Sequence, residues 1–447
     1  MEQGFLKFAK TGLHKAKQLG ADHVELFVMK SRNFEAEIKN NRIDEMKQSE
    51  SSGVGVRILK DGRFGFSFSS DFRATSLDKM VMQAITNSNY SDKDDTLRFP
   101  SPAGDYSKPA IFDEGLSKVS LEEKLDLARE TTRYAQAFDT RVKQIERSCY
   151  EDGEIELWIA NSNGIYQHQA GNYCGLACLA LGEENGEMQS GYGMNSAVRY
   201  CDLNPKDAGE MAANRAVRLI GAKQIASGKM DLVLEPLIAM QIMGIISSCF
   251  SGDAVRKKKS FLAGKIDTCV ASNQLTVVDD GTLDYRLGSG SFDGEGVPTQ
   301  RTILLEKGVL KQYLYDTASA LKDHAQSTGN GMRGGYKGTP HIGTTNYYVE
   351  AGFMSPEQLV NEVSYGVYIT EIMGAHTANI VSGDFSFGAS GILIEHGTFT
   401  HPVRGITIAG NFQNLLQQIN GIGNDLVFYG GQGAPTIRIS DITVSGK

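Results

Sequence analysis

The spacing of apolar residues predicts helices and strands that alternate from the start of the chain. Residues 1–20 carry apolar side chains at helical spacing, and residues 24–28 and then 34–38 alternate as two half-buried strands do. Apolar alternation over 54–68 surrounds an Asp61-Gly62 turn, which predicts a hairpin. A helical pattern over 77–85 follows. This order predicts a layer in which helices pack on a sheet.

A second segment shows the same order of helix and strands. Residues 90–118 contain three prolines among Ser, Asp and Gly residues, so we interpret them as a linker. Ser120, followed by Glu123, predicts a capped helix start, and Asn204 before Pro205 predicts another. The strands between these helices are expected to turn at Asp152-Gly153 and Asn163-Gly164. No repeat of fixed period accompanies this similarity.

The last half of the chain is predicted to be rich in strands. After a short strand at 232–234, residues 237–250 form a pattern that is apolar almost all round, which is typical of a helix inside a domain. We therefore predict an α+β fold: N-terminal helix-on-sheet layers followed by a mainly antiparallel β C-terminal domain with a central buried helix. The expected domains are residues 1–100, 110–222 and 225–447, since 447 residues exceed a single core.

Composition excludes several classes of protein. Fifty glycines against ten prolines indicate tight turns in a β-rich chain rather than disorder. A formal charge of −8 argues against nucleic-acid binding, and no apolar run is long enough to span a membrane. The first twenty residues lack the apolar core of a signal peptide, and the six cysteines form no Cys-x-x-Cys pair. We expect a cytoplasmic protein with reduced thiols.

A dense run of Asp, Gly and Thr residues lies between residues 279 and 333. It begins DDGT at 279–282, continues FDGEGVPTQ at 292–300 and ends STGNGMR at 327–333. Two later segments, ITIAGNF at 406–412 and GAPTIRI at 433–439, complete the pattern. In these residues the chain resembles the TldD/PmbA family, well over roughly 230–446 and weakly before that.

The resemblance implies a cytoplasmic zinc protease of two paired subunits, of which TldD carries the metal and TldE (PmbA) does not. Zinc-bearing members have His-Glu-x-x-x-His on the helix before the DDGT block, followed by a Gly-Asp and an Arg. Here Gly252-Asp253 and Arg256 hold that downstream frame. Counting back from it places Met243, Gly244 and Ser248 at the three motif positions.

These three residues cannot replace two imidazoles and a carboxylate around zinc. Zinc-bearing members also take a Cys ligand from near the C-terminus, and this chain has no Cys after Cys269. The resemblance therefore implies the metal-free TldE/PmbA-type subunit. We expect no metal and no other cofactor in this chain, and zinc only in a TldD-like partner.

The predicted function is that of a non-catalytic subunit that helps to form the peptide-binding cavity for proteolysis of unfolded peptides. The expected partners are a TldD-like subunit, in a heterodimer, or a second copy, in a homodimer, together with the peptide substrate. An alternative is a stand-alone homodimeric peptide-binding protein without hydrolytic activity. A third possibility is an enzyme that uses an unrecognised constellation such as Glu295, Arg333 and His376.

Five polar residues are candidates for binding the peptide: Glu295, Asn330, Arg333, Asn346 and His376. The glycines of 329–338 predict either a long functional loop or a floppy connection. In the first case Arg333 and Asn346 could hold a peptide carboxylate or main chain. The loop also spells a dinucleotide-binding string, but it follows a helix rather than a strand, which argues against that function.

Overall fold

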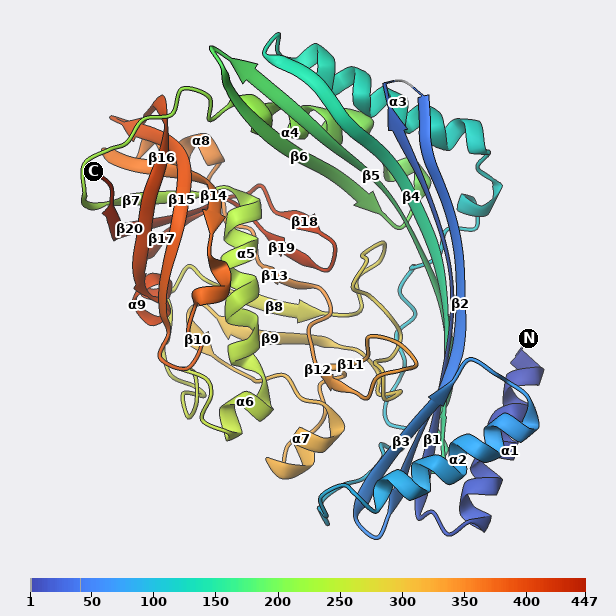
Figure 1. Cartoon of the computed structure of the whole chain (residues 1–447). Coiled ribbons are helices and arrows are strands. Elements are labelled where there is room, and N and C mark those ends of the chain that lie inside the picture. The colour runs from blue at the N-terminus through green and yellow to red at the C-terminus, as the bar shows by residue number, and fades with distance from the viewer. Residues whose placement is uncertain (1, 41) are drawn as a thin grey trace.

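A long, arched sheet faces a β-rich C-terminal domain across its concave side (Figure 1). The structure is a computed structural model that describes residues 2–40 and 42–447. Helices pack on sheets whose pairings are mostly antiparallel, so the predicted α+β class is confirmed. None of the described helices has the length and apolar character needed to cross a membrane.

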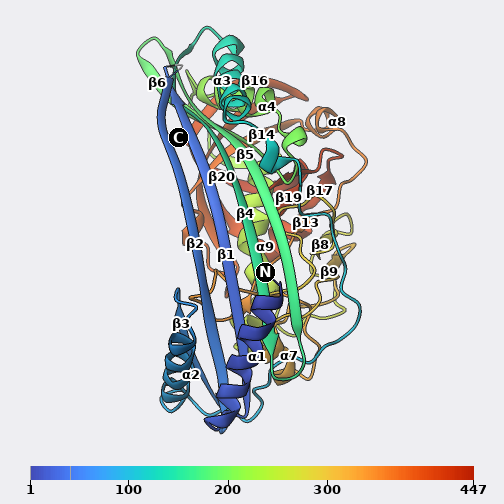
Figure 2. The ribbon, with the colours of Figure 1, turned by 90° about the vertical axis from the view of Figure 1, so that its right-hand side faces the viewer.

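The first sheet has the strand order β3-β2-β1-β4-β5-β6. Its strands are β1 (His23–Lys39), β2 (Arg42–Lys60), β3 (Arg63–Ser69), β4 (Val142–Asn161), β5 (Tyr166–Glu184) and β6 (Glu187–Ala197). Its convex face is covered by α1 (Glu2–Gln18), α2 (Ala74–Ser88), α3 (Leu121–Phe138) and α4 (Pro205–Val217). Figure 2 shows α1 and α2 near one end of the sheet and α3 and α4 near the other.

Two copies of one plan build this sheet. Each copy consists of a helix, three consecutive strands and a second helix, and β1 and β4 lie antiparallel at the centre. The first two segments of the chain therefore share one sheet. The order of elements was visible in the sequence, but the joint sheet was not.

Helix starts and tight turns agree with their local sequence signals. Ser120 and Glu123 form the predicted capping box of α3, with the Ser120 backbone N–H 2.8 Å from the Glu123 carboxylate. Asn204 caps α4. Asp61-Gly62 turns between β2 and β3 with positive φ at both residues, and Gly164 turns with φ 101°.

The predicted turn at Asp152-Gly153 is wrong, because both residues lie inside β4. Gly153 is opposite Tyr173 on β5. A Cβ atom at Gly153 would lie 2.5 Å from Cε1 of that ring, so the glycine makes room for a close side chain. Residues 24–38 likewise form one strand, β1, rather than two.

Strands of the C-terminal domain form a barrel and a second sheet. The barrel closes because β16 pairs with both β15 and β20. Its strands are β7 (Gly228–Leu234), β14 (Tyr365–Met373), β15 (Asp384–Glu395), β16 (Thr398–Asn411) and β20 (Ile437–Ser445), with β17 (Ile419–Ile422) paired to β20. The second sheet contains β8 (Val277–Asp280), β9 (Arg301–Glu306), β10 (Val309–Leu310), β13 (Tyr347–Val349), β18 (Val427–Tyr429) and β19 (Gln432–Ala434). Only β7–β14 and β13–β19 pair in parallel among the described strands of these two sheets.

Helix α5 (Pro236–Ser247) lies at the centre of this domain (Figure 1). Ile238, Ile242 and Ile246 belong to its buried face, whereas Gln241 and Ser248 are exposed. The predicted central helix is therefore confirmed for one face only. The remaining elements are α6 (Gly252–Arg256), α7 (Thr317–Lys322), α8 (Pro356–Asn361), α9 (Phe412–Gln417) and the pair β11 (Gly331–Met332) and β12 (His341–Ile342).

Candidate functional site

The segment 279–346 joins the C-terminal domain to the concave face of the first sheet. Phe292 packs with Phe27 of β1 and Ile159 of β4 in one buried cluster. The Tyr106 hydroxyl donates to the Gly296 carbonyl oxygen at 2.8 Å. The residues of the sequence signature therefore lie where the first sheet meets the C-terminal domain. We call this interface the joint, and the sheet and the domain its two layers.

Four charged side chains are buried at this joint. The Arg57 guanidinium on β2 donates to Glu25 on β1 at 2.9 Å and to Glu295 at 3.0 Å. The Arg333 guanidinium pairs with the other oxygen of Glu25, and its Nε–H donates to the Gly294 carbonyl at 2.6 Å. Two carboxylates and two guanidiniums thus balance in charge, in a region where an unpaired ion would be costly.

Asp293 fixes the backbone next to this charged cluster. Its carboxylate accepts from the backbone N–H groups of Glu295, Val297 and Gly331 at 2.8, 3.0 and 2.7 Å. Burial, together with the negative charge of Glu295, raises the pKa of Asp293 well above its usual range. The carboxyl group therefore ties the loop after β8 to β11.

Asn330 and Asn346 have a similar internal role. The Asn330 amide donates to the Asp279 carboxylate at 2.8 Å, and the Asn346 amide donates to the Asp280 carbonyl at 2.7 Å. Gly288 donates its backbone N–H to the Asn346 side-chain oxygen at 3.0 Å. Glu295, Asn330, Arg333 and Asn346 are all buried with partners inside the protein. These contacts favour a structural role, and peptide binding by the four residues stays a prediction.

The glycine-rich loop 329–338 packs against the first sheet. The Tyr336 ring covers Gly53 on β2, where a Cβ atom would lie 2.2 Å from the ring, and its edge faces Phe68. These contacts dock the loop on β2 and favour an ordered loop over a floppy connection. His376 lies exposed on the 3-10 turn Ala375–Thr377, and no contact with the buried charges is found among the described residues. The constellation of Glu295, Arg333 and His376 is not assembled.

The three residues at the expected zinc-motif positions, Met243, Gly244 and Ser248, lie in different environments. Met243 is in the core, and Ser248 is exposed with its hydroxyl donating to the Ile245 carbonyl at 3.0 Å. A Cβ atom at Gly244 would lie 2.9 Å from the Gln432 side-chain oxygen. These side chains offer no imidazole or carboxylate and do not converge, so they do not fit a zinc ion.

One other group of side chains in the described residues has the spacing of a metal site. Ligand atoms of Glu35, Glu37 and Cys149 lie within 4.8 Å of one another. Burial raises the pKa of the Cys149 thiol to about 12, which disfavours the thiolate that binds metal. The three residues lie on β1 and β4, away from the helix of the motif in sequence, and we assign them no metal.

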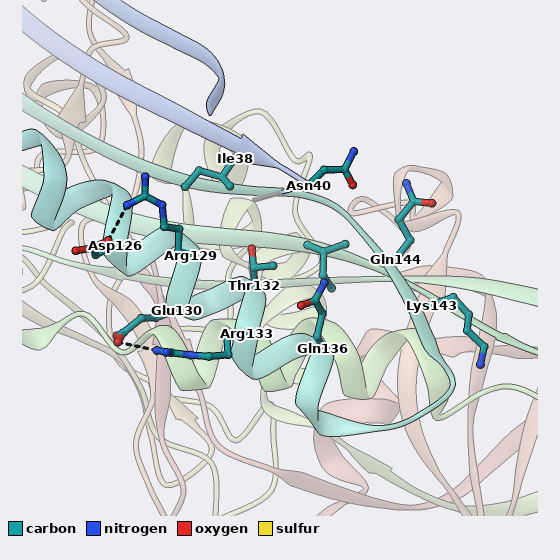
Figure 3. Close-up of a pocket in the computed structure, with 11 residues that line it drawn as sticks. Ile38, Asn40, Asp126, Arg129, Glu130, Thr132, Arg133, Gln136, Lys143 and Gln144 are labelled. Atoms are coloured by element: carbon teal, nitrogen blue, oxygen red, sulfur yellow. Dashed lines mark hydrogen bonds and ion pairs between the residues drawn. The ribbon is translucent and has the colours of Figure 1, made fainter. Parts of the chain in front are cut away.

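A surface groove of about 680 Å³ lies between α3 and the ends of β1 and β4 (Figure 3). Four of its five charged side chains are already paired, Arg129 with Asp126 at 2.7 Å and Arg133 with Glu130 at 2.8 Å. The fifth, Lys143, donates to the Thr140 carbonyl at 2.9 Å. These pairs lie along one helix and leave little unsatisfied charge for a ligand. The groove is therefore a weaker candidate than the joint.

A second cavity, of about 310 Å³, lies at the joint itself, between the first sheet and the loop after β8. Ile155, Leu157 and Arg286 are among its lining residues. The sequence does not reveal this cavity. Its walls come from separate segments that no spacing rule connects, so only the folded structure shows it.

Three family models match successive parts of the chain. The PmbA/TldA metallopeptidase domain 1 matches residues 24–88, the central domain matches 114–220 and the C-terminal domain matches 227–446. The metalloprotease PmbA of Escherichia coli O157:H7 is 24% identical, with 96% of this chain and 93% of that protein covered. A metalloprotease TldD homologue of Buchnera aphidicola subsp. Schizaphis graminum is 28% identical, over 94% and 92% of the two chains.

Solved structures share the whole fold. A Thermotoga maritima protein described as a candidate modulator of a DNA gyrase is 30% identical, with a TM-score of 0.90 over 99% of this chain and 100% of that one. TldE from Thermococcus kodakarensis has a TM-score of 0.88 at 24% identity, over 98% of this chain and 100% of its own, and supports the fold alone.

Proposed function

We propose that this chain, which belongs to the TldD/PmbA metallopeptidase family, is the metal-free, PmbA/TldE-like subunit of a two-subunit zinc protease. In this proposal a TldD-like partner holds the zinc, and this chain helps to enclose the cavity in which unfolded peptides are cut. A cytoplasmic location belongs to the same proposal.

The observation that carries the proposal is the state of the three motif positions. Met243 contributes to the core, Gly244 has no side chain, and Ser248 bonds to its own helix. A hydrolytic zinc site needs three protein ligands and a water, with a general base nearby. Helix α5 and its C-cap residue Ser248 supply none of these groups at the three positions. Peptide hydrolysis would therefore need the metal of another chain.

The outer edge of β2 supports association with a partner. Strand β3 pairs with β2 only over Val54–Lys60, and residues 42–50 of β2 are exposed. Among the described strands, that part of β2 has a neighbour on the β1 side alone. Ile43 and Met46 are 44% and 49% exposed there. A long open edge that also carries apolar side chains is a ready site for another chain.

The test is co-expression of the chain with a TldD-like protein, followed by copurification, elemental analysis and peptide hydrolysis. We expect a complex whose zinc remains with the partner and whose hydrolysis exceeds that of the partner alone. Zinc bound stoichiometrically to this chain, or hydrolysis by this chain alone, would contradict the proposal.

A matched pair of variants tests the β2 edge. Met46→Lys places a charge on this edge, whereas Met188→Lys changes a 60% exposed methionine on the opposite edge strand, β6. We expect Met46→Lys, but not Met188→Lys, to weaken association of this chain with the partner chain. The measurement is light scattering at several concentrations. Equal effects of the two substitutions would remove β2 from the interface.

The second candidate function is a stand-alone homodimer that binds peptides without cutting them. The apolar cavity at the joint favours it, because a binding site within this chain needs no partner. The two functions differ in one measurement. A stand-alone binder would leave the hydrolysis rate of a TldD-like protein unchanged when the two are mixed.

A further inference from the structure

The cavity at the joint between the first sheet and the C-terminal domain is mainly apolar. Its apolar and aromatic lining consists of Ile111, Ile155, Leu157, Tyr173, Val198 and Leu287. Its volume of about 310 Å³ is at the lower end of the range of roughly 300–1,000 Å³ for small-molecule sites. Such a space accommodates one or two amino-acid residues rather than a long peptide.

Most polar groups in the cavity wall are already bonded within the protein. The Asn172 side chain accepts from the backbone N–H of Asp113 and donates to its carbonyl, both at 2.9 Å. The Gln169 side-chain oxygen accepts from the Ser291 backbone N–H at 2.8 Å. The Ser289 hydroxyl donates to the Leu283 carbonyl. These groups hold the wall in place.

Arg286 is different, because its charge is not matched by an acid. Its guanidinium carbon lies 4.0 Å from the centre of the Phe428 ring. Among the described residues no carboxylate pairs with it, and burial lowers the pKa of Arg286. Arg286 is an exposed residue that lines this apolar cavity, and a carboxylate ligand there could accept two parallel hydrogen bonds from its guanidinium.

A neighbouring arginine provides the contrast. Arg199 lies over the Tyr285 ring at the same distance of 4.0 Å, but its guanidinium is paired with Asp202 at 2.7 and 2.8 Å. The two sites share their aromatic stacking and differ in their counter-charge. Of these two arginines, Arg286 lines the cavity and has no acid partner in the part of the chain that the structure describes.

We propose that this cavity binds the C-terminal residue of a peptide, with its apolar side chain in the pocket and its free carboxylate on Arg286. This inference rests on the proposed function, since it names a class of peptide that this chain would hold. The lining supplies the selectivity: an apolar side chain is removed from water, while a charged side chain would be buried without a partner.

The test measures binding of short fluorescent peptides to the full chain by anisotropy. A peptide that ends in leucine with a free carboxylate is compared with its C-terminal amide, with the same peptide ending in aspartate, and with N-acetyl-leucine as competitor. We expect the amide and the aspartate peptide to bind about tenfold more weakly or worse, as expected for loss of a charge-assisted contact or burial of an unpaired charge. N-acetyl-leucine should compete more weakly than the unlabelled peptide.

Two variants complete the experiment. Arg286→Met keeps an apolar stem and should remove the preference for acid over amide, while Arg199→Met should keep it. Equal binding of acid and amide by the wild-type chain, or equal losses in the two variants, would overturn the proposal. Competition by N-acetyl-leucine as strong as by the peptide would assign the site to a free apolar carboxylate instead. Copurification with a TldD-like chain is scored separately, so failure here is distinguishable from failure of the subunit role.

Discussion

Removal of the Glu25 carboxylate tests whether the buried charges hold the two layers together. Glu25 is fully buried, and its two oxygens accept separately from Arg57 and Arg333. In Glu25→Gln one of these guanidiniums meets an amide N–H₂ in place of an acceptor, and the cluster gains a net positive charge. Removal of one partner from a buried ion pair costs on the order of 3–5 kcal/mol. We expect a loss of that size in the free energy of unfolding.

The measurement is urea denaturation followed by the fluorescence of the single tryptophan, Trp158 on β4. The matched control is Glu154→Gln on β4, the strand that carries Trp158. The Glu154 carboxylate is 3.7 Å from Arg32, and both side chains are partly exposed. Exposed pairs contribute about 1 kcal/mol or less, so the control should change little. Combining Glu25→Gln with Arg333→Met removes the unpaired guanidinium and should recover part of the loss.

A result in which Glu25→Gln and Glu154→Gln have the same unfolding free energy would refute the reasoning. The charged cluster would then be incidental to the docking of the first sheet. A double variant less stable than Glu25→Gln alone would show that stacking of the Arg333 guanidinium on the Phe27 ring, 4.7 Å from its centre, outweighs the cost of the unpaired charge.

Three further predictions concern metal, packing and pH. The purified chain should bind no stoichiometric zinc after dialysis, and about one zinc per chain by elemental analysis would contradict this. Gly193→Ala should destabilise by about 1–3 kcal/mol, because its Cβ would lie 2.1 Å from the Ala208 carbonyl on α4, whereas Gly228→Ala, with open space around it, should not. Burial and Glu295 raise the pKa of Asp293, so its contribution to stability is complete below about pH 4 and is lost as pH rises through the raised pKa. The unfolding midpoint should therefore fall between pH 5 and 8 more steeply in the wild type than in Asp293→Asn.

Local sequence signals predicted the helix starts and turns that depend on neighbouring residues, whereas they missed a strand that is exposed on both faces. The capping box at Ser120 and the turn at Asp61-Gly62 are set by neighbouring residues, and both are present. The outer half of β2 was missed because residues 42–50 are exposed on both faces and show no alternation. Such a strand is held by its pairing with β1, which a local pattern does not contain.

The site was less predictable because its contacts are distant in sequence. Arg333 pairs with Glu25, 308 positions away, and Glu295 with Arg57, 238 positions away. A buried carboxylate with such a partner and one aimed at a ligand look alike in sequence. Polar residues in a glycine-rich loop therefore suggested a binding surface, whereas the structure uses most of them as internal bonds.

At the interface between the first sheet and the C-terminal domain, the signature residues and the cavity residues have different roles. This difference limits which properties can be inferred for this chain from its family. The signature residues around 279–346 secure the two layers to each other, which requires the same charges and glycines whatever ligand is bound. The neighbouring cavity is lined largely by aliphatic residues and includes one arginine, Arg286, for which the described residues supply no acid partner. Substitution of aliphatic residues there would change the shape of the pocket without disturbing the ion pairs that join the layers. Ligand preference can therefore differ between proteins that share the signature, and it must be argued from the cavity of each chain.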